Sequence, residues 1–389
     1  MNYLFKIKVL IKEKRFFKTL KKKIYPYLIG FVLIFSAKKS DFKLHITKNR
    51  NIDKDDLPLA ERIFKSYKKM KLDEEKISVY FKPSSLWQTQ LETSYSFLLD
   101  SHKNDDLEKF LYFLQNFGNW DTYLGVENQL FFKKYSNNFL LRNFLLKEIF
   151  KGQFDLWKLF NKNQDLGEVG MPNYGNQIGA IIKNNFITMG SFYLHMYAEN
   201  ILNYLDKNHN RILELGGGYG HLAYYVLKKV KNFTYIDFDL PETLTLASYF
   251  LSKSFPKKRN FFYGESKFNK TIENDFELIF LPPWEIENLD SNSIDLAINK
   301  NSLGEMDPEA AKNYLSHITR TSKYFFSVNH EHVRNSFSDG KKSLLNSEYN
   351  LDKKFKTLIK YPELGHLIWE NNKLDYDGSD ILFYIYEKK

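Results

Sequence analysis

The chain contains no cysteine, and this absence removes several classes of chemistry at once. Without thiols it can form no disulfide, no thiolate nucleophile and no cysteine-ligated metal site, which is typical of a protein in a reducing compartment. Long apolar runs are scarce as well. The run Ile24–Ala37 covers 14 residues, whereas a membrane-spanning helix needs ~20. We therefore expect a cytoplasmic protein.

A charge excess large enough to bind nucleic acid is missing from the body of the chain. The 389 residues include 57 Lys and Arg against 47 Asp and Glu, a net charge of +10. Residues 1–23 hold nine of these basic residues and one acidic residue, so the remainder is close to neutral. Because a phosphate backbone is bound by a basic patch on a folded domain, we expect no DNA or RNA partner. Residues 1–37 are either a solvated leader or a peripheral anchor to anionic lipid at the inner membrane face.

The hydrophobic pattern divides the chain into three regions. Residues 1–40 are basic and then apolar, residues 41–188 show mostly helical spacing, and residues 189–389 alternate between strand and helix patterns. Such alternation predicts an α/β fold with a mostly parallel sheet and helices on both faces. The expected strands are Ile212–Leu215, Phe233–Asp237, Phe276–Leu281, Ile294–Asn299, Tyr324–Val328 and Ile381–Tyr386.

One glycine-rich turn in the third region points to a nucleotide cofactor. Residues 211–223 read RILELGGGYGHLA, a short apolar strand, a glycine turn and the start of a helix. Glu214, Gly216, Gly218 and Gly220 form E-x-G-x-G-x-G, whereas the dinucleotide pattern begun at Gly216 needs glycine or alanine at position 221, where histidine stands. The spacing therefore favours S-adenosylmethionine (SAM) over NAD.

A carboxylate follows the next strand at the distance that a ribose ligand requires. Asp239 comes 25 positions after Glu214, and nucleotide folds place their ribose-binding carboxylate about 20 residues after the glycine turn. A carboxylate accepts hydrogen bonds from both hydroxyls of a diol. The alternative interpretation is a loop carboxylate that caps the helix beginning near Pro241.

Several of these segments resemble the bacterial sugar O-methyltransferase family. The resemblance lies in the runs ELGGGYGHLA, DLPETL and DLAINKNSLGEM, together with Gly175-Asn176-Gln177, His195-x-Tyr197 and the segment 324–329. It covers residues 84–389 and is strongest over 171–330. It implies a Rossmann-like class I methyltransferase sheet preceded by a mostly helical region, SAM as cofactor, and a sugar or glycan hydroxyl as acceptor in surface polysaccharide biosynthesis. The turn FDLP is also similar to the ribose-binding turn of plant small-molecule O-methyltransferases, which favours Asp239 over Asp237.

The catalytic base does not carry over from this resemblance. In the plant-type enzymes the segment that corresponds to NSLGEM contains a histidine base, and Gly304 occupies that place here. Ligands in parallel sheets bind beyond the carboxyl ends of the strands, so we expect the base among Glu305, His330 and His195. A packing role is the commoner interpretation for His195, and helix capping is the alternative for Glu305. Asn299 is a further candidate for contact with the cofactor.

Two other functions compete with methyl transfer. An NAD-dependent nucleotide-sugar oxidoreductase or epimerase would use the same strand–turn–helix unit, and a catalytically inactive membrane-peripheral scaffold would retain the fold without turnover.

The sequence His330-Glu331-His332 does not make a metal site if it is extended, because alternate side chains then point in opposite directions. We expect no bound metal.

Overall fold

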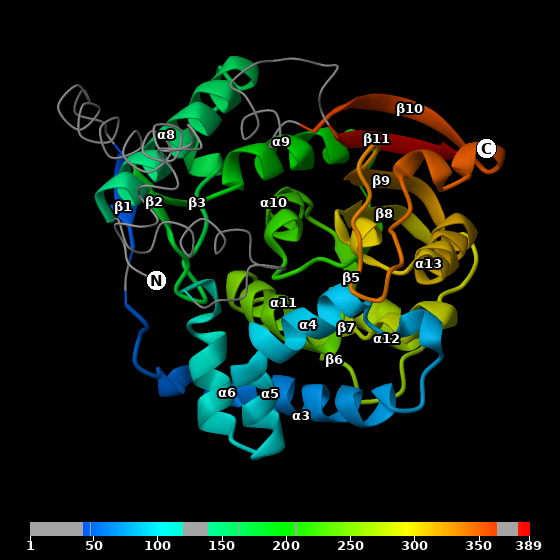
Figure 1. Ribbon diagram of the computed structural model, residues 1–389, viewed down its shortest axis with the longest axis horizontal. Coiled ribbons are helices and arrows are strands. Elements are labelled where there is room, and N and C mark those ends of the chain that lie inside the picture. The colour runs from blue at the N-terminus through cyan, green and yellow to red at the C-terminus, as the bar shows by residue number, and fades with distance from the viewer. Residues whose placement is uncertain (1–41, 47, 120–138, 163, 207, 364–379) are drawn as a thin grey trace, which may run out of the picture.

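Eight strands form a central, mostly parallel sheet in the order β10-β11-β9-β8-β4-β5-β7-β6 (Figure 1). The computed structural model describes residues 42–46, 48–119, 139–162, 164–206, 208–363 and 380–389. The strands of this sheet are β4 (Asn210–Leu215), β5 (Phe233–Phe238), β6 (Asn260–Phe262), β7 (Leu278–Leu281), β8 (Ile294–Lys300), β9 (Ser322–His330), β10 (Phe355–Pro362) and β11 (Ile381–Lys388). The strands from β9 to β6 are parallel to one another, and β11 is antiparallel to both β9 and β10. The α/β fold and all six expected strands are confirmed.

Helices cover both faces of the sheet because the strands are apolar on both sides. Ile212 packs in the core under one set of helices, and its neighbour Leu213 packs in the core on the opposite face, as the side-chain alternation of a strand requires. One face is covered by α9 (Ser191–Leu202), α10 (His221–Lys229) and α11 (Pro241–Ser254). The other is covered by α12 (Lys270–Asp275) and α13 (Pro308–Thr321).

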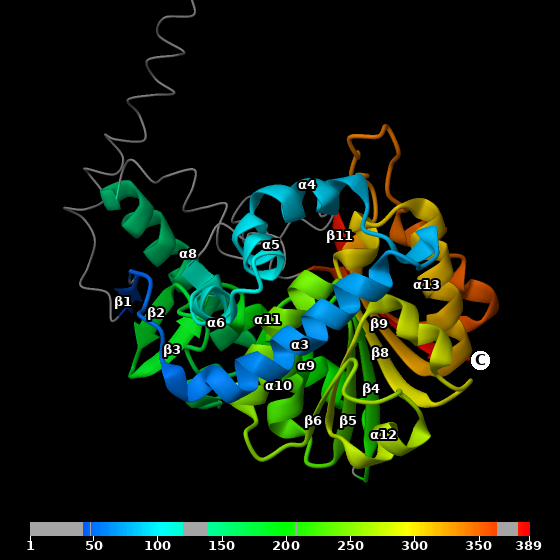
Figure 2. The same ribbon diagram turned by 90° about the horizontal axis from the view of Figure 1, so that it is seen from below.

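The helical region packs on the sheet domain and shares its core. Its helices are α3 (Leu57–Glu74), α4 (Ser85–Thr93), α5 (Ser96–Lys103), α6 (Leu107–Leu114) and α8 (Phe139–Phe160). Helix α3 lies along α11 (Figure 2), and Glu242 of α11 accepts a hydrogen bond from Tyr67 at 3.1 Å and pairs with Lys71 at 2.9 Å. Buried residues of α3 and α6 belong to the same apolar cluster as those of the sheet. The division of the chain at residue 188 stays a prediction.

A small antiparallel sheet interrupts the region expected to be helical. It consists of β1 (Phe42–His45), β2 (Gly179–Ile182) and β3 (Asn185–Thr188). The two residues between β2 and β3, Lys183 and Asn184, both have positive φ angles of 46° and 67°, which is the backbone of a type I′ hairpin turn. The predicted leader and the apolar run Ile24–Ala37 lie outside the described residues.

Candidate active site

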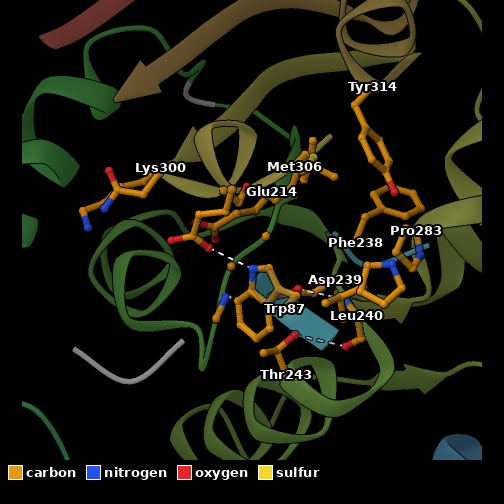
Figure 3. Close-up of a pocket in the computed structure, with 18 of the residues that line it drawn as sticks. Trp87, Glu214, Phe238, Asp239, Leu240, Thr243, Pro283, Lys300, Met306 and Tyr314 are labelled. Atoms are coloured by element: carbon orange, nitrogen blue, oxygen red, sulfur yellow. Dashed lines mark hydrogen bonds between the residues drawn. The ribbon is translucent and has the colours of Figure 1, made fainter. Parts of the chain in front are cut away.

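A cavity of about 210 Å³ lies beyond the carboxyl ends of β4, β5 and β8 (Figure 3). The strand pairing explains why distant residues meet there, because Glu214 of β4 is in register with Asp237 of β5 and with Ile298 of β8. The cavity is lined by the glycine turn after β4, the turn after β5 and the segment after β8, together with residues 81–84 and Trp87 of the helical region. This is the position in which parallel α/β sheets bind ligands.

The glycine turn brings backbone rather than side chains to the cavity. Gly216 and Gly218 line it and have φ angles of +74° and +62°. A Cβ on Gly216 would lie 2.3 Å from the Ser302 hydroxyl oxygen, so only glycine fits between the turn and that segment. Gly220 does not line the cavity. A Cβ there would meet Leu251 of α11 at 2.8 Å, so this glycine serves the packing of α10 on α11.

Asp239 is tied to the glycine turn by its side chain. One carboxylate oxygen accepts a hydrogen bond from the backbone N–H of Gly218 at 2.9 Å, and the other accepts from the N–H of Leu240 at 2.7 Å. Burial raises the pKa of Asp239 to about 6. Asp237, by contrast, does not line the cavity and lies beneath the turn, 2.9 Å from where a Cβ of Gly217 would be. The position therefore favours Asp239 over Asp237 as a ligand of a bound molecule.

Glu214 places a second carboxylate in the cavity, at the end of β4. The residue is 2% exposed, and one carboxylate oxygen accepts a hydrogen bond from the Tyr235 hydroxyl at 2.6 Å. Burial raises its pKa to about 7, and the negative charge of Asp239 acts in the same direction.

Glu305 places a third carboxylate in the cavity, just after β8. Its Oε2 accepts a hydrogen bond from the indole N–H of Trp87 at 2.9 Å, and its backbone carbonyl accepts one from the Ser84 hydroxyl at 2.6 Å. Burial raises the pKa of Glu305 to about 7. Glu305 lines the cavity, and its role as a base stays a prediction.

Asn299 lies at the expected strand end but turns away from the cavity. Its amide group donates to the carbonyl of Leu215 at 2.8 Å and accepts from Asn329 at 2.9 Å, and the side chain is fully buried. Contact between Asn299 and a cofactor is therefore not supported. The next residue, Lys300, lines the cavity instead, because successive side chains of a strand point to opposite sides.

The two candidate histidines do not line the cavity either. His330 ends β9, and its Nδ1 lies 2.5 Å from the carboxylate of Asp380. His195 is fully buried in α9, where its Nδ1 accepts a hydrogen bond from the indole of Trp157 at 3.2 Å, and burial lowers its pKa to about 4. The structure therefore assigns His195 to packing and leaves Glu305 as the candidate base within the cavity.

Three cavity residues were missed as functional candidates by the sequence analysis. Trp87 comes from α4, Lys300 from the end of β8 and His221 from the first turn of α10. In Figure 3, Lys300 lies to the upper left of Trp87 and Tyr314 to its upper right. Strand-end alternation could have pointed to Lys300 and the motif itself to His221. Trp87 carried no local signal because its place depends on the packing of a separate helix.

The described residues contain neither a helix suited to span a membrane nor a cluster of side chains suited to bind a metal. Among the described helices, none combines the length and apolar character needed to cross a bilayer. Within the described ranges, no group of three or more His, Asp or Glu side chains is arranged to hold a metal ion.

Comparison with known proteins gives structural likeness only. No protein-family model matches the chain, and a search of curated proteins gives no match. The matching solved structures include mitomycin 7-O-methyltransferase MmcR, with 14% identity over 52% of this chain and 55% of that chain and a TM-score of 0.34. A SAM-dependent methyltransferase from Aquifex aeolicus matches at 14% identity over 49% of this chain and 88% of its own, with a TM-score of 0.31.

A third match is 1,6-didemethyltoxoflavin-N1-methyltransferase from Burkholderia thailandensis, crystallised with bound 1,6-didemethyltoxoflavin and S-adenosylhomocysteine. It shows 16% identity over 50% of this chain and 78% of its own, with a TM-score of 0.34. The match to the mitomycin enzyme spans little more than half of that protein. Because these TM-scores are low, the likeness carries no argument about function.

Proposed function

We propose that this protein is a SAM-dependent methyltransferase that transfers the methyl group to a sugar hydroxyl of a surface glycan. The observation that carries the proposal is the bond between Asp239 and the Gly218 backbone, which places a buried carboxylate beside a glycine turn in one cavity. Glu305 lies in the same cavity and supplies a base. The sugar acceptor rests on the sequence resemblance.

The cavity residues fit an adenosine-bearing, positively charged cofactor. Asp239 accepts two backbone hydrogen bonds, and since a carboxylate offers about four acceptor sites, it can still accept from ribose hydroxyls. The glycine turn lets the backbone approach a ligand closely. Glu214, Asp239 and Glu305 contribute three acidic groups to the cavity lining, against two lysines, of which Lys300 is half-buried and Lys82 is exposed. This surplus of carboxylates suits the positively charged sulfonium.

For methyl transfer the protein has to align the donor methyl group with the acceptor hydroxyl and to remove the hydroxyl proton. When bound, the cofactor supplies a methyl group already activated for displacement. Glu214 and Asp239 orient the donor from the strand ends, and Glu305 accepts the proton of the acceptor hydroxyl. A pKa of about 7 suits this role, because a general base works best when its pKa lies near the operating pH.

The placement of His221 counts against the NAD-dependent alternative. A dinucleotide needs its diphosphate against the N-terminus of the helix after the glycine turn, with a small residue at the third glycine position. Here the imidazole of His221 is the first side chain of α10, and its Nε2 lies 3.2 Å from the hydroxyl of Thr188 and 3.3 Å from that of Ser191. Its ring also stacks on Tyr219, with 5.0 Å between centroids. An imidazole thus stands at the N-terminus of this helix, at the position that the dinucleotide pattern keeps small.

Ligand-dependent thermal shift tests the cofactor directly. A ligand that binds the native state raises its melting temperature, so we expect stabilisation by SAM and S-adenosylhomocysteine and none by NAD. Stabilisation by NAD alone would overturn the proposal in favour of the oxidoreductase.

Incubation with radiolabelled SAM and fractionated cell-surface glycans then tests the acceptor. Label in a glycan fraction, dependent on intact Glu305, supports a sugar hydroxyl as the acceptor. Cofactor binding with label only in non-glycan small molecules would retain the methyltransferase and refute the sugar assignment. Cofactor binding without transfer to any fraction would favour the inactive scaffold.

A further inference from the structure

The helical region contributes directly to the candidate base. Its residues Ser84 and Trp87 hold Glu305 at two points, the hydroxyl on the backbone carbonyl at 2.6 Å and the indole N–H on the carboxylate at 2.9 Å. These contacts join segments more than 200 positions apart in the chain. A carboxylate that follows a strand would otherwise be free to rotate about its side-chain bonds.

The indole of Trp87 is held in place by packing against buried aromatic rings. Its ring lies against the fully buried Tyr95 at 6.3 Å between centroids, and Tyr95 lies against Phe113 at 6.2 Å. An indole nitrogen can only donate a hydrogen bond. A hydrogen bond to an ionised acceptor is stronger than one between neutral groups. The fixed N–H of Trp87 therefore favours the ionised form of its carboxylate partner.

We propose that Trp87 is a positioning residue for methyl transfer, whose indole N–H orients the Glu305 carboxylate and stabilises its ionised form. This inference rests on the proposed function, because it assigns Glu305 the role of base. It makes the helical region part of the catalytic apparatus as well as a cover for the cavity.

The other groups around Glu305 act on its charge in different directions. Burial raises its pKa, and the negative charge of Asp239 at the end of β5 raises it further, whereas the Trp87 hydrogen bond and the positive charge of Lys300 at the end of β8 lower it. Tyr95, the residue just before α5, also feels the charge of Glu305, and burial raises its own pKa well above the usual value, so it stays neutral. Loss of the indole N–H should thus move the titration of Glu305 upward.

Replacement of Trp87 by phenylalanine tests this inference through the pH dependence of kcat/KM. The variant keeps an aromatic ring and removes the N–H. A hydrogen bond to a charged group is worth about one pKa unit or more, so the acid limb should move up by about one pH unit. We expect roughly tenfold lower kcat/KM at pH 6 and a change within about twofold at pH 9.

Trp157→Phe is the matched control. It removes another indole N–H, the one that bonds His195 outside the cavity, so it should lower thermal stability and leave the acid limb in place. If Trp87→Phe does not fold, 3-benzothienylalanine at position 87 replaces the N–H by sulfur in a ring of nearly the same shape. An equal loss of kcat/KM at every pH, or the same shift in the Trp157 variant, would overturn the inference.

Glu305→Gln separates this inference from the proposed function. If that variant retains full turnover, Glu305 is not the base and the inference about Trp87 fails with it, whereas methyl transfer from SAM stands. If it loses turnover while the acid limb of Trp87→Phe stays in place, the inference about Trp87 fails alone and the proposed function stands.

Discussion

Substitution of Gly216 by alanine tests how tightly the glycine turn is packed. The φ angle of +74° is unfavourable for alanine, at a cost of about 1–2 kcal/mol. The new Cβ would also lie 2.3 Å from Oγ and 2.4 Å from Cβ of Ser302. Ser302 is held by its bond to the Leu215 carbonyl at 2.9 Å and by the amide of Asn299, so relief of the clash should cost a further ~1–3 kcal/mol. We expect a loss of about 2–5 kcal/mol in the free energy of unfolding, measured by urea denaturation.

Gly340→Ala separates the backbone cost from the clash. Gly340 has a similar φ of +85°, but a Cβ there meets nothing within 4 Å, so only the cost of about 1–2 kcal/mol should appear. Adding Ser302→Gly to Gly216→Ala should recover part of the loss beyond additivity, because the double variant removes the clashing side chain. Equal destabilisation by Gly216→Ala and Gly340→Ala would refute the close approach of this turn to Ser302.

Three further predictions concern the cofactor, the buried charge and the leader. Asp239→Ala should weaken SAM binding by ~1–3 kcal/mol in calorimetry, and unchanged affinity would remove Asp239 as the ribose ligand. Burial raises the folded-state pKa of Glu214 from 4.5 to about 7, so its ionisation destabilises the fold as pH rises through this range. Wild-type stability should therefore fall relative to Glu214→Gln between pH 5 and 8 in urea titrations, and parallel profiles would contradict this. Removal of residues 1–37 should abolish salt-sensitive binding to anionic vesicles; a full-length chain that ignores such vesicles at low salt would refute the anchor.

The strands that the sequence predicts and those that it misses differ in burial and neighbours. The six predicted strands are apolar runs, and all belong to the central sheet. By contrast, β6 has three residues at one edge, and β10 at the other edge carries the exposed side chains of Lys356 and Thr357. An edge strand exists because a neighbouring strand offers it backbone hydrogen bonds, and this pairing leaves little trace in the hydrophobic pattern. The hairpin of β2 and β3 was missed because its glycine and asparagine residues favour an interpretation as loop.

What the sequence alone determined is the local chemistry of the cofactor side. A buried strand, a glycine turn and a carboxylate at a set distance are encoded within residues 210–240. Their spacing alone selects Glu214, Gly216, Gly218 and Asp239, and all four line the cavity. The fold class followed from the alternation of strand and helix patterns over the last half of the chain.

Tertiary structure alone decided which side chains meet across the cavity. The direction in which β8 ends turns Asn299 inward to the sheet and Lys300 to the cavity, and the packing of α4 brings Trp87 to Glu305. The sequence contains no pattern that predicts the contact between Trp87 and Glu305, because that contact depends on how α4 packs on the sheet domain. The hydrogen bond from Trp87 to Glu305 is therefore a property of the folded molecule.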